Sequence, residues 1–390
     1  MATVVKPPTL VVLQLTGGND PLNTVIPYGD PLYWDNRPTV RIPEQEILHI
    51  DNVYGFHPSM AALKPFWDEG KMAILAGIGY PNVDYSHFRS MDIWYTAEPD
   101  KIATDGWLGK VVREMDPKAE NVLTAVNFGR GLPRAFTLEG VPVASVAELD
   151  SYGLLTSLSS VAERQSALDV FSCMYDDGWN DMGHRPVRLR QPGESAGDVL
   201  RYMGQTGLDA QKGADILRTA VDGYGSSVTY PTSSIASSLK GIAQVKIAGL
   251  GTRVFYCATG SFDTHANQLK VHAQLWQEVS EAVSAFVADL REHGEADDVI
   301  MLLWTEFGRR ARDNGAGTDH GAGGHAFVIG EQVKGGFYGE YPSLRESDLM
   351  LGNLKYGIDF RSAYASILER WLDIDAKPIV NGSFEQLAFV

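Results

Sequence analysis

Aspartate and histidine side chains recur in three short segments, each of which follows an apolar run and is marked by glycine. The first segment, LTGGND, ends at Asp20, and the second, FYCATGSFDTH, contains Asp263 and His265. The third segment, residues 299–325, contributes Glu306, Asp319, His320 and His325. Carboxylates combined with imidazoles are typical ligands of Zn²⁺, Mn²⁺ or Fe²⁺, whereas a purely carboxylate set suits Mg²⁺ or Ca²⁺ better. Together the segments predict a metal or acid–base site.

Each segment taken alone also has an ordinary structural explanation. Asp20 fits a turn or a helix N-cap, and a single Asp-x-His pair such as Asp263 with His265 often binds nothing. The functional interpretation depends on the count, because four of the nine histidines lie in glycine-rich or polar turns rather than on apolar stripes. These four are His87, His265, His320 and His325.

Ser86 is the best candidate for a nucleophile. It lies in YPNVDYSHFRSMDIWYTA, where a Pro-Asn turn precedes a helical pattern, so it falls at or near a helix N-terminus. Backbone N–H groups and the helix dipole favour anions there, although Ser86 also fits a plain N-cap. His87 is either a ligand or the acid that protonates the leaving group, and Arg89 either clamps an anionic oxygen or is a solvated surface residue. Less well placed alternatives to Ser86 are Thr24, Ser90 and Thr264.

Short apolar runs alternate with helical patterns along most of the chain. Such runs, typical of strands buried on both faces of a parallel sheet, cover residues 9–15, 72–77, 122–128, 253–258, 299–304 and 326–329. Helical patterns cover residues 268–291 and 360–372, and Pro58 fits a first helical turn. In the first of these patterns one inward stripe is expected to consist of Val271, Leu275, Val279, Val283, Phe286 and Leu290. We therefore expect an α/β fold with a mostly parallel central sheet flanked by helices. The carboxyl ends of such strands meet at one edge, which would bring the three segments together.

The middle of the chain lacks a convincing strand. Residues 145–250 read as helices and loops, with helical patterns at 157–174 and 195–221. We expect one domain over residues 1–390, in which 145–250 form a mainly helical insertion or cap over the carboxyl edge of the sheet. Such an insertion would shape the substrate pocket.

Composition excludes several classes of function. The 44% hydrophobic content is that of a globular protein, and no stretch approaches the roughly 20 apolar residues of a membrane-spanning helix. The net charge of −16 argues against a nucleic-acid partner. The two cysteines, Cys173 and Cys257, are too few for a disulfide framework and are expected to be buried small side chains. The first residues lack the pattern of a signal peptide, so we expect a cytoplasmic protein, or an exported, periplasmic one if a leader was removed.

Five strings resemble a large bacterial family catalogued as domain of unknown function number fifteen hundred and one. They are LTGGNDPLNTVIPYGD, YSHFRSMDIWYTA, GSFDTHANQ, TEFGRRARDNGAGTDHGAGGHAFVIGEQVKGGFYGEYPSL and DFRSAYASILERWLD, so the resemblance runs from about residue 9 to residue 390. Members often carry a twin-arginine export leader. The family looks like a branch of the alkaline phosphatase superfamily, which also contains sulfatases, phosphodiesterases and phosphoglycerate mutases. The resemblance thus implies an alkaline-phosphatase-like fold.

The resemblance also implies a two-metal site, whose ligands appear in a fixed order along the chain. Asp20, Asp319 and His320 would hold one ion; Asp263, His265 and His325 would hold the other, with Ser86 between them. Three departures from the superfamily pattern stand against this set. Thr264 alone separates Asp263 from His265, His325 follows His320 by only five residues, and Glu306 rather than Asp319 stands at the strand end. Glu306 is therefore a further candidate ligand, and the site could hold one metal.

The leading hypothesis is a metal-dependent hydrolase or transferase of a phosphate ester, or less readily of a sulfate ester. The nucleophile would be Ser86 or a metal-bound hydroxide, one or two divalent ions (Zn or Mn) would be the cofactor, and the partner would be a small anionic ester. Neither cysteine lies in a Cys-x-Pro-x-Arg string, so the formylglycine of common sulfatases cannot form. The alternatives are a metal-binding or scaffold protein that retains the fold without the chemistry, and a nucleotide-binding protein that uses GGND as a phosphate loop.

Overall fold

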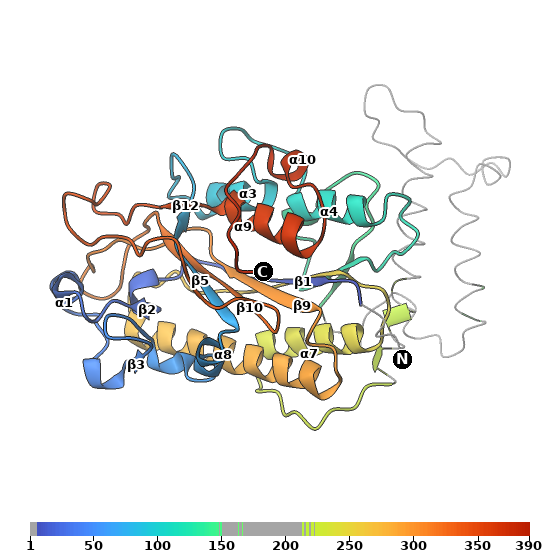
Figure 1. The fold of residues 1–390 in the computed structure, drawn as a ribbon, viewed down its shortest axis with the longest axis horizontal. Helices are drawn as coiled ribbons and strands as arrows, with labels where there is room; N and C mark the ends of the chain where they lie inside the picture. The colour runs from blue at the N-terminus through green and yellow to red at the C-terminus, as the bar shows by residue number, and fades with distance from the viewer. Residues whose placement is uncertain are drawn as a thin grey trace.

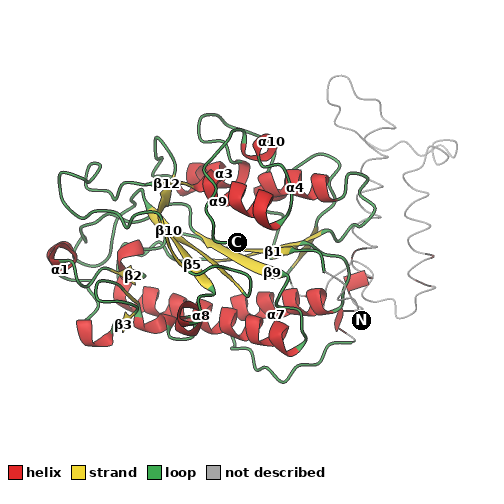
Figure 2. Cartoon of the chain, in the orientation of Figure 1, coloured by secondary structure: helices red, strands yellow, loops and turns green. Residues whose placement is uncertain are grey.

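The computed structural model describes residues 6–147 and 223–390, together with residues 149, 163, 166, 213, 216, 217, 220 and 221. Within these residues, a nine-stranded sheet lies between two layers of helices (Figures 1 and 2). Its strands, labelled as in Figure 1, are β1 (Thr9–Leu15), β5 (Met72–Gly79), β6 (Ala125–Phe128), β7 (Ala144–Val146), β8 (Val254–Thr259), β9 (Val299–Trp304), β10 (Gly324–Gly330), β11 (Gly336–Tyr338) and β12 (Ile358–Asp359). The six predicted strands are all present.

The strand order is β11-β5-β10-β9-β1-β8-β6-β7, and β12 also pairs with β5. All pairs are parallel except those of β10, which runs antiparallel to both β5 and β9. The predicted fold class, a mostly parallel sheet flanked by helices, is confirmed. Because β10 is reversed, its amino end lies at the edge where β1, β5, β8 and β9 have their carboxyl ends.

Helices cover both faces of the sheet. One face is covered by α7 (Ser234–Ile247) and α8 (Gln268–Glu292), and the other by α3 (His87–Thr96), α4 (Trp107–Met115), α9 (Phe360–Ser366) and α10 (Lys377–Val380) (Figure 1). Successive residues of a strand point to opposite faces, so Val11 and Leu13 pack in the α7–α8 core while Leu10 and Val12 pack in the other. That two-sided burial explains the unbroken apolar run of β1.

The segment after β1 packs as a smaller unit beside the main sheet. It contains β2 (Val25–Ile26), α1 (Pro31–Asn36), β3 (Leu48–His49), β4 (Gly55–Phe56) and α2 (Lys64–Asp68), with short 3-10 turns at Pro21–Asn23, Glu44–Glu46 and Pro58–Met60. A further 3-10 turn, Arg134–Phe136, lies beside α4, and α9 continues as one π-helical turn, Ile367–Trp371. The predicted helix at 360–372 is therefore present, with a change of hydrogen bonding at its middle.

Helix α8 differs from its prediction in its first half. We expected Val271 and Leu275 on the inward stripe, but the side chains buried there are Gln268, His272 and Trp276. Their four-residue spacing keeps one helix face inward, and each of the three side chains forms a hydrogen bond with the loop after β1. A hydrophobicity pattern does not detect polar residues that are buried against other polar residues.

Most of the predicted insertion at 145–250 lies outside the described residues, as do most of the helical patterns at 157–174 and 195–221. At its end, α7 belongs to the helical layer of the sheet: Ile235, Leu239 and Ile242 are buried in the same core as α8. Cys257 is buried in β8, whereas Cys173 is outside the described residues. No described helix has the length and apolar character needed to cross a membrane. The compartment stays a prediction.

Candidate metal centre

The predicted polar segments meet at one edge of the sheet. The loop after β1 carries Asp20, the loop after β8 carries Asp263, the loop after β9 carries Glu306, and α3 begins at His87 shortly after β5. The residues that precede β10 reach the same edge because β10 runs antiparallel to its neighbours. Strand direction alone therefore assembles side chains that are separated by up to 300 positions in the sequence.

Three imidazole rings converge on the carboxylate of Asp263. The Nε2 atoms of His265 and His320 each lie 3.1 Å from Asp263 Oδ1, and His87 Nε2 lies 3.5 Å from Asp263 Oδ2. The two Nε2 atoms of His265 and His320 are 3.0 Å apart. Within the described part of the chain, the donor atoms of His87, Asp263 and His320 form a group that could hold a metal ion, with all three within 4.8 Å of one another.

The opposite nitrogen of each ring is fixed by a hydrogen-bond acceptor. His320 Nδ1 donates to the carbonyl of Tyr85 (2.7 Å), His87 Nδ1 to Glu306 Oε1 (2.7 Å) and His265 Nδ1 to Asp319 Oδ1 (3.1 Å). A carbonyl oxygen only accepts, and Glu306 Oε1 also accepts from the Gly17 N–H at 2.8 Å. In the neutral rings, each Nε2 then presents a lone pair to Asp263.

Unshared electron pairs that converge on a carboxylate repel one another unless a cation or a proton lies among them. Metal-binding histidines commonly donate their other ring N–H to a carboxylate or a backbone carbonyl, which is the arrangement found for all three rings. His87 Nε2 is buried and has no hydrogen-bond partner within the described residues. The four residues thus fit a divalent ion with nitrogen and oxygen ligands. Its ligands would be His87, His265, His320 and Asp263.

The charge of Asp263 is stabilised by its neighbours. Burial raises the pKa of this carboxyl, but the hydrogen bond and charge of Arg309, followed by His320 and His265, outweigh burial and hold the pKa at about 2. For His87, the hydrogen bond to Glu306 raises the pKa against the opposing effect of burial. Asp263 is therefore a carboxylate at any ordinary pH.

Arg309 connects the loops that carry these ligands, although no sequence pattern distinguishes it from its neighbour Arg310. Its buried guanidinium donates to the carbonyls of Gly17, Gly18, Phe262 and Thr318, and to Asp263 Oδ1 at 2.7 Å. Gly17 has φ +116°, and a Cβ there would lie 2.5 Å from the backbone nitrogen of Asp263. Glycine is thus required for the loop after β1 to approach the loop after β8.

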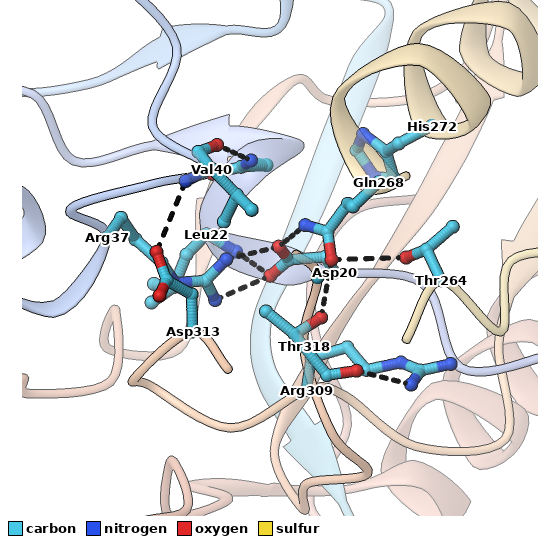
Figure 3. A network of polar contacts seen from close by, with 12 residues as sticks. Asp20, Leu22, Arg37, Val40, Thr264, Gln268, His272, Arg309, Asp313 and Thr318 are labelled. Carbon is cyan, nitrogen blue, oxygen red and sulfur yellow. Dashed lines mark hydrogen bonds and ion pairs between the residues drawn. The ribbon is translucent and has the colours of Figure 1, made fainter. Parts of the chain in front are cut away.

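Asp20 has its carboxylate oxygens occupied by protein partners. It forms a fully buried, bidentate ion pair with Arg37 and accepts hydrogen bonds from Gln268 Nε2 (2.5 Å) and the Leu22 N–H (3.1 Å) (Figure 3). Burial raises the pKa of Asp20, but the charge and hydrogen bonds of Arg37 outweigh it and lower the pKa. The ligand role implied for Asp20 by the resemblance is replaced here by an ion pair, because both oxygens face Arg37 and Gln268.

His325 is likewise separate from the converging rings. It is the second residue of β10 and is buried, with its Nδ1 accepting from the Gly77 N–H at 3.4 Å and its ring packing against Tyr341. Two further buried histidines, His57 and His272, pack edge to face near Asp20, with ring centroids 5.3 Å apart. Burial lowers the pKa to about 3 in His57 and His325 and to about 4 in His272, so these three rings are neutral at pH 7.

Glu306 and Asp319 contact ligands rather than converging on Asp263. Glu306 is 1% exposed and fixes His87, and its Oε2 accepts from the Thr305 hydroxyl at 3.2 Å. Asp319 is 49% exposed and fixes His265, with Asn314 Nδ2 as a second donor at 3.0 Å. These two predicted ligands therefore contact the histidines that converge on Asp263 and do not themselves converge on it.

Ser86 is the exposed N-cap residue of α3, and its side chain makes no capping hydrogen bond. It lies between Tyr85 and His87, both of which contact the histidine cluster. Arg89 instead faces the loop after α3: it pairs with Asp92 at 2.9 Å and donates to the carbonyls of Glu98, Pro99 and Lys101. Arg89 was expected to be either an anion clamp or a solvated surface residue, and these contacts match neither role, because its donors hold that loop.

A comparison with protein-family models finds a match over part of the chain. Residues 205–381 match the model of a family described as Protein of unknown function (DUF1501), the family that the motifs indicate. This stretch includes Asp263, His265 and His320, whereas His87 lies outside it. A comparison with curated proteins finds no match.

Solved structures align with the chain at low identity. A 2-O GAG sulfatase aligns at 9% identity and a TM-score of 0.36, over 84% of this chain and 65% of that one. The PsFucS1 sulfatase from Pseudoalteromonas sp. aligns at 13% identity and a TM-score of 0.39, over 98% and 71% of the two chains. A mutant of the alkaline phosphatase PafA aligns at 10% identity and a TM-score of 0.32, over 79% of this chain and 64% of that one. The chain thus spans less than two thirds of the first of these proteins, and at these TM-scores the alignments say nothing about its activity.

Proposed function

We propose that this protein is a metal-dependent hydrolase or transferase that acts on a small phosphate ester, with a sulfate ester as the second choice. The observation that carries the proposal is the convergence of three imidazole Nε2 atoms on Asp263, each ring fixed through its Nδ1. Zn²⁺ or Mn²⁺ is the ion that this nitrogen-rich set favours. One ion suffices, because Asp20 and His325 are engaged elsewhere.

A bound metal ion would supply positive charge for an anionic substrate. It would draw electron density from an oxygen of the ester, whereas the buried guanidinium of Arg309 is already paired with Asp263. The first turn of α3 presents backbone N–H groups at the same place, and helix N-termini of this length attract anions. An acidic protein with net charge −16 can therefore still bind an anion at this edge.

Ser86 is the proposed nucleophile. Its hydroxyl is exposed and free of the capping bond that an N-cap serine usually makes, and its two neighbours in sequence contact the ligands. His87, as a ligand whose Nδ1 hydrogen is held by Glu306, would position the start of α3 rather than transfer a proton. A non-catalytic metal-binding protein is the competing function and would have the same metal content without turnover.

The test begins with elemental analysis of the full chain, with aryl phosphates, phosphodiesters and sulfates as substrates. We expect about one Zn or Mn ion per chain, lost in His320→Ala and retained in His49→Ala, a matched exposed histidine in β3. Protein that carries no transition metal from undepleted medium would disprove the metal centre. Metal without turnover on every substrate would favour the non-catalytic function.

Ser86→Ala then tests the nucleophile. We expect turnover to fall by orders of magnitude with metal content unchanged, because the variant loses a bond made in the reaction rather than a ligand. Thermal stability should stay within about 0.5 kcal/mol, since no capping bond is lost. Ser347→Ala, at another exposed serine, serves as the control. Full activity in Ser86→Ala would remove this hydroxyl from the reaction.

A further inference from the structure

Gln268, the first residue of α8, is buried beneath the metal centre and contacts three separate loops. Its Nε2 donates to Asp20 Oδ2 at 2.5 Å, and its Oε1 accepts from the hydroxyls of Thr318 (2.7 Å) and Thr264 (3.2 Å) (Figure 3). Thr264 lies between Asp263 and His265, and Thr318 precedes His320 by two residues. One amide group therefore touches the neighbours of three proposed ligands.

The orientation of this amide is fixed by its partners. Asp20 pairs with Arg37 and can only accept, so the NH₂ end of Gln268 must face Asp20. The oxygen end then faces the two threonine hydroxyls, which can donate. Gln268 and Thr318 are fully buried and Thr264 is 2% exposed, so each lost hydrogen bond would leave a buried polar group unpaired.

The two ligand-bearing loops also pack backbone against backbone at this point. Thr318 N donates to the Thr264 carbonyl at 3.1 Å, and Gln268 N donates to the Ala316 carbonyl at 3.2 Å. A Cβ on Gly317 would lie 2.1 Å from the Thr264 carbonyl oxygen, so only glycine permits this approach. The two loops are therefore in direct backbone contact, and the side chain of Gln268 forms hydrogen bonds with both of them.

We propose that Gln268 is the positioning residue of the metal centre, which fixes the separation of His265 and His320 by joining Thr264 and Thr318 to the rigid Asp20–Arg37 pair. The inference rests on the proposed metal centre and goes beyond it, because it assigns a role to a residue that touches neither metal nor substrate. Asp20 then acts through Gln268 as an anchor for the ligands. A change in Gln268 should alter ligand geometry without removing a ligand.

Gln268→Met in the full chain tests the proposal, with Co²⁺ as the probe because its visible absorption reports ligand geometry. We expect the Kd for Co²⁺ to rise about 10- to 100-fold, as for residues that orient ligands, with a changed absorption spectrum. Gln274→Met, an exposed glutamine of the same helix, should change neither. An unchanged Kd and spectrum in Gln268→Met would overturn the proposal, whatever happens to thermal stability.

Thr318→Val and Thr264→Val are milder variants for the case in which Gln268→Met does not fold. Each removes one hydrogen bond to Gln268 Oε1. Each should shift the Co²⁺ spectrum in the same direction, and two unchanged spectra would overturn the proposal. If the unaltered protein binds no Co²⁺, the proposed metal centre fails, and metal-free NMR still decides the positioning role. Displaced imidazole ¹⁵N signals of His265 and His320 in Thr318→Val would support that role, and unchanged signals would overturn it.

Discussion

Two groups of the same residue types lie within one edge of the sheet and have opposite character. In the partly exposed group, His87, His265 and His320 direct their Nε2 atoms at Asp263. In the buried group, Asp20 is neutralised by Arg37, and the nearby rings of His57 and His272 are neutral and pack against each other. The difference shows that residue type alone does not define a metal ligand. Both oxygens of the buried Asp20 are occupied by Arg37 and Gln268, whereas Asp263 contacts Arg309 through Oδ1 alone and its side chain is 43% exposed.

The strongest test of this contrast is Asp20→Ala, which leaves Arg37 buried and unpaired. We expect the free energy of unfolding to fall by about 3–5 kcal/mol, measured by urea denaturation, while metal stoichiometry in the folded protein is kept. Asp68→Ala, which breaks a half-exposed pair with Lys64, should cost less than about 1 kcal/mol. Loss of the metal with unchanged stability would instead place Asp20 among the ligands.

Acid should destabilise the protein through the buried histidines. The pKa values of His57, His272 and His325 are about 3 to 4 in the folded protein, against 6.5 for an ordinary histidine. Below pH 6.5 the unfolded chain therefore binds protons that the folded chain does not. Unfolding free energy then falls with decreasing pH by up to about 1.4 kcal/mol per unit for each ring. His272→Gln should flatten this slope between pH 6.5 and 4.5, and His49→Gln should not. Equal slopes in both variants would contradict the buried, neutral assignment.

Glu306→Gln tests the histidine cluster through Glu306, a buried residue that contacts the proposed ligand His87. The variant keeps an acceptor for His87 Nδ1 but loses the charge of a carboxylate that is 1% exposed. We expect metal affinity to fall about 10- to 100-fold in a chelator competition, with Glu346→Gln, at an exposed position, as the control. If Glu306 is itself a ligand, as its place at a strand end allowed, the loss would be far greater and stoichiometric binding would disappear.

Asp319→Asn should have the smallest effect of the four. Asp319 orients His265 as Glu306 orients His87, but it is 49% exposed, so water can replace the lost contact. We expect metal affinity to fall by less than about tenfold in the same competition. An effect larger than that of Glu306→Gln would show that Asp319 binds the metal directly.

Much of the fold followed from the sequence because strands buried on both faces leave continuous apolar runs. All six such runs are strands, and the long helix at 268–291 ends within one residue of α8. The site was harder to predict. Sequence order and loop position indicated Asp263, His265 and His320, but they did not reveal that Arg37 neutralises Asp20 or that Gln268 and His272 face inward. Such contacts join residues far apart in the chain, and no local pattern records them.

The reversed direction of β10 has a consequence for which residues of this site share a loop. The chain leaves the sheet at the carboxyl end of β9 and re-enters it at the amino end of β10, on the same edge, whereas the return from β8 to β9 requires the whole of α8 as a crossover. Residues 305–323 therefore form one loop that begins and ends at the same edge of the sheet. This loop includes Glu306, Arg309, Asp319 and His320. A change in the length of this loop would leave the pairing of β9 with β10 in place. The reversed strand thus places one proposed ligand, His320, on the same loop as Glu306 and Asp319, the residues that orient His87 and His265.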